Sequence, residues 1–463
     1  MDKHKLIRAS AAAFTAQGVT AAVSAATVLL LAGRLGAAEY GFWQLYTLAG
    51  SFSGLFHLGL CDGIYLRLGG QKYEELDFGG LGHQFRLMVL LEVAAAAAII
   101  PPVILTCGGS GRAWVLCAAL VYMPVFNAAA FLGYLLQATG RTTAYSMSIV
   151  IDRAAFVILA ALAALLGADS YEPYIAASIA AKLLSLLYCI SKNRRVVFTS
   201  GRAPLAQTVA DISAGSRLLW GNLSGLLVVS AARIAVIFRW GEAEFGRISL
   251  AITLSGLIMQ FGAQIGMVVF PELRQEVNEA RQRIIARMRV ALGLALPAVF
   301  LVYFPAKPAV AAWLPQNTLE SSSLALLLPL CLFEGKTRLV NQTCLKVMRL
   351  EGRLLSANLL SAAFSIVLCF FSAYVLGSLW AVLVSAVLAA ALRCFLSAYP
   401  VADTEERLSA FMELLSDLAI SAVFVSAALL LPELAALIVY VLFYAGYIIL
   451  RRTDLAILLP ERV

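Results

Sequence analysis

A small set of ionisable side chains lies inside long apolar stretches of this sequence. Such a group is costly to bury in apolar surroundings, and proteins keep it there mostly for a function, such as binding an ion or a charged substrate. The residues that meet this description are Glu92, Asp152, Arg153, Lys182, Arg233, Glu334, Lys336 and Arg338. Because their types can bind charged groups and exchange protons, they are the first candidates for chemistry.

Some of these charges can neutralise one another locally. Asp152 is followed directly by Arg153, and Glu334 stands one helical turn before Arg338. Residues at such spacing can form ion pairs on one helix. Each pair is therefore open to two interpretations, a structural ion pair or part of a binding site.

Cations remain in excess after this local pairing. Lys182, Arg233 and Lys336 have no obvious carboxylate nearby in the sequence. Arginine binds phosphate oxygens through two parallel hydrogen bonds, and lysine binds them as a point charge. We therefore expect a polar cavity with surplus positive charge, which suits an anionic ligand such as phosphate or diphosphate.

Uncharged polar side chains extend this set. Two stripes at helical spacing consist of Gln17, Thr20, Ser24 and Thr27 and of Ser249, Thr253, Gln260 and Gln264. Such stripes serve either helix packing or a shared polar cavity. The residues that we expect to bind substrate are Arg233, Lys336, Arg338, Lys182, Arg153, Asn341, Gln342, Gln17 and Gln260.

The composition places these residues in a membrane protein. Of the 463 residues, 61% are hydrophobic and 13% are charged, whereas a soluble domain is about half apolar and a quarter charged. Apolar runs of about twenty residues, long enough to cross a bilayer, recur along the chain. Backbone groups in lipid must bond within their own segment, which favours helices. The sequence thus predicts an all-α polytopic membrane protein.

Hydropathy and polar breaks predict about fourteen spanning helices. They cover residues 8–31, 40–60, 85–106, 113–137, 143–166, 171–190, 212–238, 245–270, 290–314, 321–347, 354–376, 379–399, 414–431 and 434–450. We group them into an N-terminal six-helix bundle, a basic cytoplasmic linker, a C-terminal six-helix bundle and two additional helices. The boundaries of these parts are 1–191, 192–211, 212–400 and 401–463.

The positive charges predict the orientation. With both termini in the cytoplasm, roughly two dozen of the 35 Lys and Arg residues lie in or beside cytoplasmic loops. This bias also explains the net charge of +8 without nucleic acid as a partner. The expected location is the cytoplasmic membrane of a bacterium, crossed many times.

One short motif occurs twice and suggests two homologous halves. Residues 34–42 read RLGAAEYGF, and residues 239–247 read RWGEAEFGR. Each copy is a tight break between two apolar segments, where glycine supplies unusual backbone angles. Six helices separate the copies, an even number, so we expect a parallel repeat with its axis along the membrane normal.

Motifs for catalysis and metal binding were not found in the sequence. There is no phosphate-binding loop, no HExxH and no Cys/His cluster, and the predicted outer loops are short. His57 lies near the end of a predicted span, where an interfacial position is favoured over a proton relay. We therefore expect a protein that is not an enzyme and needs neither a metal nor a cofactor.

Two long segments carry a family resemblance. RLGAAEYGFWQLYTLAGSFSGLFHLGLCDGIYLRLGG, followed by QKYEELD, resembles the polysaccharide-biosynthesis and O-antigen flippases. GEAEFGRISLAITLSGLIMQFGAQIGMVVFPELRQ, with Phe270-Pro271, is similar to the seventh-to-eighth helix region of the same family. These proteins belong to the multidrug/oligosaccharidyl-lipid/polysaccharide (MOP) exporter superfamily. The resemblance implies its MATE-like fold, with two pseudo-symmetric six-helix bundles and, in some members, two extra helices.

The resemblance also implies a function. It predicts a Wzx-like transporter that flips undecaprenyl-diphosphate-linked oligosaccharide, such as an O-antigen or teichoic-type repeat unit, across the bacterial cytoplasmic membrane. Relatives that flip the peptidoglycan precursor keep an arginine cluster in their first two helices, whereas 8–31 carries only Ser, Thr and Gln in its interior. The expected partners are the lipid-linked glycan, membrane lipids and, as a candidate, a polysaccharide polymerase, with the flippase itself a monomer.

Such a transporter needs a driving force. Without a phosphate-binding loop, an ion gradient of Na+ or H+, or consumption of the product, must drive net flux. The candidate residues for ion coupling are Glu92, Glu334 and Asp152, although Glu334 can instead pair with Arg338.

Two other functions compete with the flippase. A drug or cation antiporter of the same superfamily would need carboxylates for its cargo, which disagrees with the surplus of cations. A membrane enzyme, such as a polymerase or glycosyltransferase, would need acid, base or nucleophilic groups in a sizeable outer loop. The residue pattern therefore favours the flippase over both.

Overall fold

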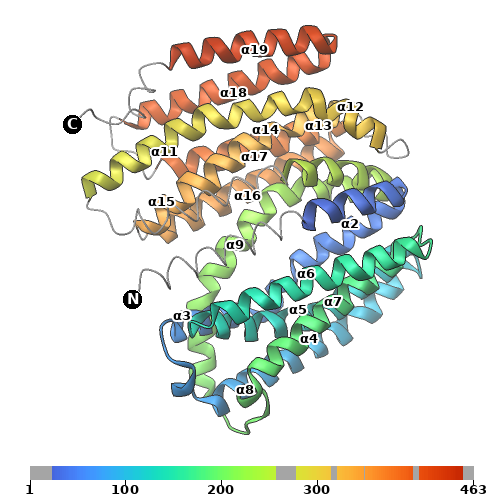
Figure 1. The fold of residues 1–463 in the computed structure, drawn as a ribbon, viewed down its shortest axis with the longest axis vertical. Coiled ribbons are helices and arrows are strands. Elements are labelled where there is room, and N and C mark those ends of the chain that lie inside the picture. Colours follow the sequence, from blue (N-terminus) through green and yellow to red (C-terminus); the bar gives the residue numbers. More distant parts are fainter. Residues whose placement is uncertain (1–22, 257–277, 314–320, 349, 400–405, 452–463) are drawn as a thin grey trace. The chain divides into compact units, whose positions relative to one another are not determined.

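A computed structural model describes residues 23–256, 278–313, 321–348, 350–399 and 406–451. Within these ranges the chain forms helices and their connections, and no strand (Figure 1). The chain divides into two compact units, Met1–Leu223 and Ser224–Val463. The division falls within one long helix, α9 (Leu205–Trp240), so the two units are considered separately below.

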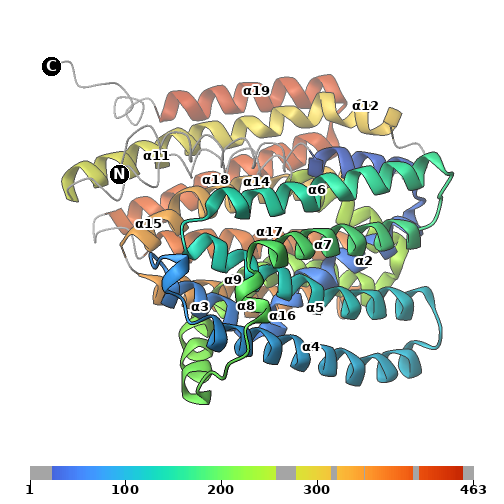
Figure 2. The same ribbon diagram turned by 60° about the horizontal axis from the view of Figure 1, so that its bottom comes forward.

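Unit 1 contains the first eleven described elements. They are the helix Val23–Arg34, α2 (Ala37–Ser51), η1 (Ser53–His57), α3 (Leu60–Leu68), η2 (Tyr73–Glu75), α4 (Phe78–Cys107), α5 (Gly111–Ala138), α6 (Thr142–Leu165), α7 (Glu172–Lys192), α8 (Arg194–Phe198) and the first half of α9. Helices α4, α5, α6 and α7 lie side by side (Figure 2). The side chain of Asp77 caps the start of α4, because its Oδ1 accepts a hydrogen bond from the Gly80 N–H at 3.0 Å.

Unit 2 contains the rest of α9 and the elements that follow it. They are a helix over 242–256, α11 (Asn278–Ala298), η3 (Val299–Val302), α12 (Tyr303–Trp313), α13 (Ser321–Leu327), α14 (Pro329–Lys336), η4 (Thr337–Asn341), α15 (Gln342–Val347), α16 (Glu351–Tyr374), α17 (Leu379–Ala398), α18 (Glu406–Leu430) and α19 (Glu433–Leu450). Helices α18 and α19 lie side by side (Figure 1).

Ten helices of the described ranges are long and apolar enough to cross a membrane. They coincide with ten of the expected spans, namely those predicted over 85–106, 113–137, 143–166, 171–190, 212–238, 290–314, 354–376, 379–399, 414–431 and 434–450. The chain is therefore a multi-pass membrane protein, as predicted. Two of the other four expected spans, 8–31 and 245–270, lie partly outside the described residues.

The span predicted over 40–60 is not one continuous helix. Helix α2 ends at Ser51, and the 3-10 helix η1 leads to Leu58 and Gly59, which have φ of 53° and 91°. Two consecutive residues in the left-handed region break the helix, and α3 then starts a new one. Within α3, Cys61 and Ile64 are buried inside unit 1.

The span predicted over 321–347 is also interrupted. Its helix is broken at Leu328, before Pro329 starts α14, and η4 is a π-helical segment. Proline lacks the N–H that a continuous helix would need, and π-helical turns are frequent at functional sites. This interrupted span contains Glu334, Lys336 and Arg338.

Both copies of the repeated motif break a helix, as expected, but with different backbone angles. Gly241 has φ of 84°, the left-handed value that favours glycine. Gly36 has φ of −63° and caps the start of α2, so glycine is not required there for its angle. Glu39 accepts a hydrogen bond from the Tyr171 N–H at 3.1 Å, which ties the first copy to the start of α7.

Helices α3 and α9 approach closely within unit 1. A Cβ on Gly63 would lie 1.8 Å from Asp211 O, and one on Gly215 would lie 2.0 Å from Gly59 O. Only glycine allows this spacing. Arg67 on α3 donates to both carboxylate oxygens of Asp211 on α9, at 2.8 and 3.0 Å. The first half of α9 is therefore fixed to unit 1.

The last two helices pack onto unit 2 through aromatic rings. Phe300 of η3 stacks on Phe424 of α18, with ring centroids 4.7 Å apart. Tyr440 of α19 is fully buried and donates to Pro297 O at 2.7 Å. Consequently α18 and α19 are integral parts of this unit, and their polar residues can reach its interior.

Candidate functional site

Unit 2 contains a cavity of about 260 Å³ with charged residues in its wall. Helix α9, the helix over 242–256, α14 and η4 supply its lining. The polar lining residues are Ser230, Arg233, Ser255, Glu334 and Arg338. Three residues predicted from the sequence, Arg233, Glu334 and Arg338, are therefore brought together at one site.

Glu334 lies between two arginines. Its carboxylate accepts hydrogen bonds from Arg393 Nη1 at 2.9 and 3.2 Å and from Arg338 Nε at 3.0 Å. Glu334 is 3% exposed, and a carboxylate so deeply buried needs cationic partners to remain ionised. The predicted pairing of Glu334 with Arg338 is confirmed, but a second arginine shares the carboxylate.

Arg393 was missed by the sequence analysis. It is 3% exposed on α17, and its Nε donates to Asn358 Oδ1 of α16 at 2.8 Å. Its Nη1 also lies 3.4 Å from Gly225 O of α9, where a Cβ on Gly225 would come within 2.7 Å of the guanidinium. The signal was available, since Arg393 carries the sole charge in the sequence from 379 to 398.

Arg233 reaches the cavity from α9. Its Nε donates to Ser249 Oγ at 3.0 Å, and its guanidinium carbon lies 5.6 Å from the centroid of the Phe245 ring. Both partners belong to the helix over 242–256, which begins within the second motif copy. Thr253, one turn after Ser249, bonds instead to the backbone of its own helix at 2.7 Å. The expected polar stripe thus serves in part to position Arg233.

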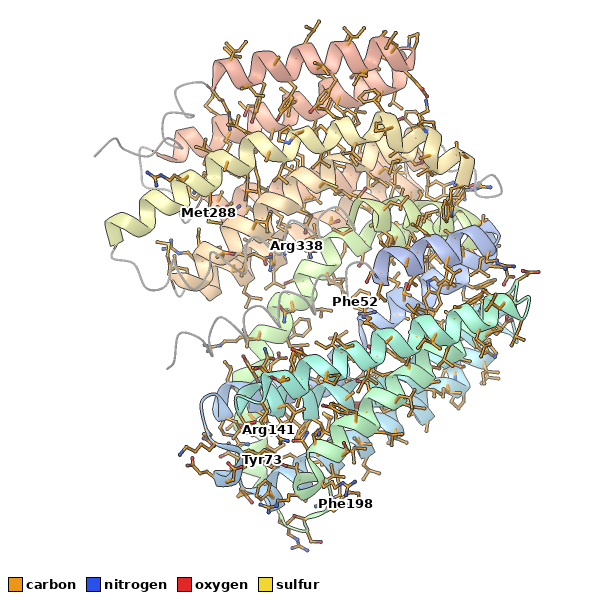
Figure 3. All side chains as sticks on the ribbon, viewed as in Figure 1. Phe52, Tyr73, Arg141, Phe198, Met288 and Arg338 are labelled. Atoms are coloured by element: carbon orange, nitrogen blue, oxygen red, sulfur yellow. The ribbon has the colours of Figure 1, made fainter. Side chains whose placement is uncertain are left out.

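Arg338 is the accessible cation of this site. Its side chain is 57% exposed, although its Nε is held by Glu334. Figure 3 labels Arg338 among the side chains of unit 2. Glu334 accepts a hydrogen bond from the Nε of Arg338, which leaves the two terminal nitrogens of that guanidinium group accessible. The wall of the cavity and the residues bonded to it therefore hold three arginines, Arg233, Arg338 and Arg393, and one carboxylate, that of Glu334.

Lys336 belongs to a second cluster, formed with α18. Its Nζ donates to Glu413 Oε1 at 2.7 Å and to Asp417 Oδ2 at 2.5 Å. Arg289 and Asn341 line the same small cavity of about 30 Å³, which is large enough for a water molecule. Here two carboxylates surround the buried lysine.

Lys182 is likewise paired, within unit 1. Its Nζ donates to Asp152 Oδ2 at 2.6 Å and lies 5.5 Å from the centroid of the Phe126 ring. The expectation that Lys182 and Lys336 have no carboxylate partner is therefore wrong. Their partners come from other helices, which spacing along one helix cannot reveal. Arg153, beside Asp152, has an exposed side chain.

The four amide side chains predicted to bind substrate lie in different surroundings. Asn341 is buried and donates from its Nδ2 to Cys394 O at 3.0 Å and to Ser397 Oγ at 2.9 Å, both on α17. Gln342, the first residue of α15, is half-buried. Gln17 and Gln260 lie outside the described residues. Asn341 thus has a clear packing role, and its contribution to substrate binding stays a prediction.

Glu92 stands apart from the other predicted acids. It is 1% exposed in unit 1, and Oε1 accepts a hydrogen bond from Asn127 Nδ2 at 2.8 Å. Of the three ion-coupling candidates, Glu334 is bound by arginines and Asp152 by a lysine, whereas the hydrogen-bond partner of Glu92 is a neutral amide. Within the described ranges no group of His, Cys, Asp and Glu is arranged to hold a metal ion.

Comparison with known proteins identifies the fold. No protein-family model and no curated protein matches the sequence. Among solved structures, the lipid II flippase MurJ in an inward closed conformation is similar with a TM-score of 0.70 and 12% identity, over 97% of this chain and 100% of that one.

Two solved structures of MOP superfamily transporters are also similar. An inward-facing MATE family transporter of the MOP superfamily has a TM-score of 0.62 and 16% identity, over 86% of this chain and 96% of its own. A MOP superfamily transporter from Pyrococcus furiosus, whose binding pocket is described as reversed in polarity, has a TM-score of 0.52 and 14% identity, over 89% and 95%. The predicted fold class, the MATE-like fold of MOP flippases, is thereby confirmed.

Proposed function

We propose that this protein is a flippase for undecaprenyl-diphosphate-linked oligosaccharide in the bacterial cytoplasmic membrane. The observation that carries the proposal is the arginine-rich cavity of unit 2, in which Arg338 is 57% exposed beside a carboxylate already bound by Arg393. A diphosphate presents several anionic oxygens at once, and the planar guanidinium group binds such oxygens by paired hydrogen bonds.

Glu334 has a positioning role in this proposal. A carboxylate at the wall of an anion site would normally repel the ligand, yet this one is shared by two arginines. It fixes the Nε edge of Arg338, so the remaining N–H groups face a ligand without losing further side-chain freedom. Arg233, held by Ser249, supplies a second guanidinium to the same cavity.

Transport in this proposal proceeds by alternating access. The diphosphate and its sugars cannot cross hydrocarbon unaided, because burying unpaired charge costs far more than binding returns. The polar head group is bound in the cavity while the prenyl tail stays in lipid, and access changes from one leaflet to the other. Lipids and a polysaccharide polymerase are the proposed partners of a monomeric flippase.

Variants of Arg233 test whether the cavity binds the lipid-linked glycan. Arg233→Ala is expected to abolish flipping of the lipid-linked glycan in proteoliposomes while the protein still inserts and purifies normally. Arg233→Lys should restore part of the activity, since lysine keeps the charge but loses the paired hydrogen bonds. Arg194→Ala, a change on the surface of α8 in unit 1, is the matched control. Normal flipping by Arg233→Ala would contradict the proposed site.

The proposed orientation has a separate test. With both termini cytoplasmic, cysteines introduced at Ala37 and Glu242, in the two motif copies, should both react with an impermeant reagent added from outside. The eight native cysteines must first be replaced. Labelling at only one of the two positions would contradict the parallel repeat.

Antiport of a drug or cation is the second candidate function. The observation that favours it is the pair of carboxylates at Lys336, because Glu413 and Asp417 together outnumber the lysine by one negative charge. Uptake of a cationic dye by proteoliposomes, compared with flipping of the diphosphate lipid, separates the two functions. Dye uptake that survives Arg233→Ala, without glycan flipping by the wild type, would favour antiport.

A further inference from the structure

The end of unit 1 that carries α8 is rich in cations without an acidic partner. Segments 72–86, 138–143 and 192–204 contain seven lysine and arginine residues but three aspartate and glutamate residues. Lys72 lies 3.9 Å from the Glu75 carboxylate. The other six cations, which have no carboxylate oxygen within 4.0 Å among the described residues, are Arg86, Arg141, Lys192, Arg194, Arg195 and Arg202.

Two of these cations meet at one pair of aromatic rings. The guanidinium carbon of Arg141, just before α6, lies 4.4 Å from the centroid of the Tyr73 ring. That of Arg195, on α8, lies 5.8 Å from the centroid of the Phe78 ring, and the two rings are 5.4 Å apart. Burial raises the pKa of the Tyr73 hydroxyl, while the positive charges of Arg141 and Arg195 act to lower it. Both guanidinium groups therefore lie near one tyrosine.

Close packing and hydrogen bonds hold these two arginines in place. A Cβ on Gly82 of α4 would lie 2.3 Å from Val196 O, so glycine is needed for α8 to approach α4. Arg86 Nη1, also on α4, donates to two backbone carbonyls at the end of α8, at 3.1 and 3.2 Å. Arg141 Nη1 donates to Lys192 O at 3.1 Å. Because both side chains are positioned in advance, a ligand loses less entropy on binding them.

This end of unit 1 lies at a surface of the membrane. The helix ends found here are the start of α4, the end of α5, the start of α6 and the end of α7. Helices that cross a bilayer in succession alternate in direction, so these four ends face the same side. Figure 3 labels Tyr73, Arg141 and Phe198 at this end. The two arginines are therefore at the depth of lipid head groups.

Exposed apolar side chains accompany the cations. Phe198 on α8 and Leu205 at the start of α9 are each 73% exposed. A free anion would pair with the arginines but leave these apolar groups in water. A phospholipid supplies both a phosphate and acyl chains, and apolar rings beside basic residues are typical of segments that lie at an anionic membrane surface.

We propose that Arg141 and Arg195, beside Tyr73 and Phe78, bind the phosphate of one anionic phospholipid, while Phe198 enters the acyl region. The two guanidinium groups donate to the non-bridging oxygens of the phosphate diester. The exposed carboxylate of Glu74 also acts on Tyr73, where it raises the pKa, so two cations face one anion at this site. The site is separate from the cavity of unit 2, and its occupant does not depend on the transported substrate.

The test measures lipid binding by the full-length protein in nanodiscs of phosphatidylcholine, into which phosphatidylglycerol is titrated. Hydrogen–deuterium exchange of segment 194–201 is the local measurement, because a bound lipid protects this segment. We expect protection that saturates with phosphatidylglycerol. Arg141→Gln and Arg195→Gln should each raise the midpoint of the titration about tenfold, the effect of losing one charge-assisted hydrogen bond.

Arg194→Gln is the matched control. It removes the same charge from the same helix and leaves both arginine–ring contacts in place. Screening of exposed charges at about 0.15 M salt should limit its effect to less than about twofold. Equal shifts for Arg194→Gln and Arg195→Gln would indicate diffuse surface charge and overturn the site.

The wild type alone also tests the proposal, so the result does not depend on any variant folding. Equal protection by phosphatidylcholine without phosphatidylglycerol, or no protection by either lipid, would overturn it. Inorganic phosphate, added to nanodiscs of phosphatidylcholine, should leave the exchange of segment 194–201 unchanged. Protection by inorganic phosphate equal to that by phosphatidylglycerol would assign the site to a free anion and overturn the phospholipid as its occupant.

Discussion

Glu334 and Lys336 point to opposite sides of α14, because residues two positions apart on a helix differ by about 200°. On one side, two arginines hold one carboxylate at a cavity of about 260 Å³, which Arg233 also lines. On the other, two carboxylates hold one lysine beside a cavity of about 30 Å³. The same charged residue types therefore make two different kinds of site on one short helix.

This difference between the two clusters distinguishes a candidate binding site from a structural ion network. In the Lys336 cluster the lysine contacts both carboxylates at short distance and little space remains, which is typical of a structural ion network. In the arginine cluster Arg338 is accessible and the cavity can admit a polar group. The cavity, rather than the presence of charge, identifies the candidate binding side, and four predictions test this distinction.

The largest effect is expected on the structural side. Lys336→Met should lower the free energy of unfolding by about 3–5 kcal/mol, because it leaves Glu413 and Asp417 buried without their cation. Unfolding by denaturant in detergent micelles measures the loss. Combining it with Glu413→Gln and Asp417→Asn should recover most of the stability, since the neutral set has no unpaired charge. A failure to recover would show that the network has another role.

The next effect is on transport. Arg338→Ala should lower the flipping rate about ten- to a hundredfold, the equivalent of one or two charge-assisted hydrogen bonds. Its effect on stability should stay under about 1 kcal/mol, because an ion pair with so exposed a side chain is largely screened. Rates in proteoliposomes and unfolding of the same preparation check both. Equal losses in both measurements would make Arg338 a structural residue.

A smaller effect concerns the support of Arg393. Gly225→Ala places a methyl group 2.7 Å from the Arg393 guanidinium, and the strain should cost about 1–3 kcal/mol. The matched control is Gly221→Ala on the same helix, where a Cβ has no neighbour within 4 Å. That change should be neutral or stabilising by up to about 1 kcal/mol, because alanine favours the helix. Similar results for both glycines would argue against a fixed Arg393.

The smallest effect distinguishes the two acids of the Lys336 cluster. Glu413→Gln should cost about 1 kcal/mol, less than Asp417→Asn, since burial strengthens an ion pair with a matched partner. The side chain of Glu413 is 20% exposed and that of Asp417 is 3% exposed. Thermal unfolding of the two single variants, compared at the same pH, gives the order. The reverse order would mean that Lys336 depends mainly on Glu413.

Sequence patterns predicted the spanning helices well. The length and apolar composition of a span are local properties, so α4 to α7 and α16 to α19 were all expected close to where they occur. The interruptions at Leu58–Gly59 and in η4 were not predicted. They depend on contacts with other helices, such as the carbonyl of Ser53 with Asn127, and local composition does not contain that information.

Only part of the candidate site was predicted, because sequence patterns show local spacing and not contacts between helices. Glu334 and Arg338 were found because they lie one turn apart on one helix. The partners of Lys182 and Lys336 lie on α6 and α18, and no spacing rule connects them. Arg393 is different, since a charge inside an apolar span is a local signal and could have been included.

The π-helical segment η4 sets the register of α15, the helix that follows the two charged clusters. A π turn holds one residue more than an α turn, so it shifts every side chain after it around the axis relative to an uninterrupted α-helix. Asn341, at its end, meets Cys394 O and Ser397 through that shift. The segment thus behaves as an inserted residue: deleting one position between 337 and 341 would restore α winding and turn α15 out of phase with α17, while Glu334 and Lys336 kept their places.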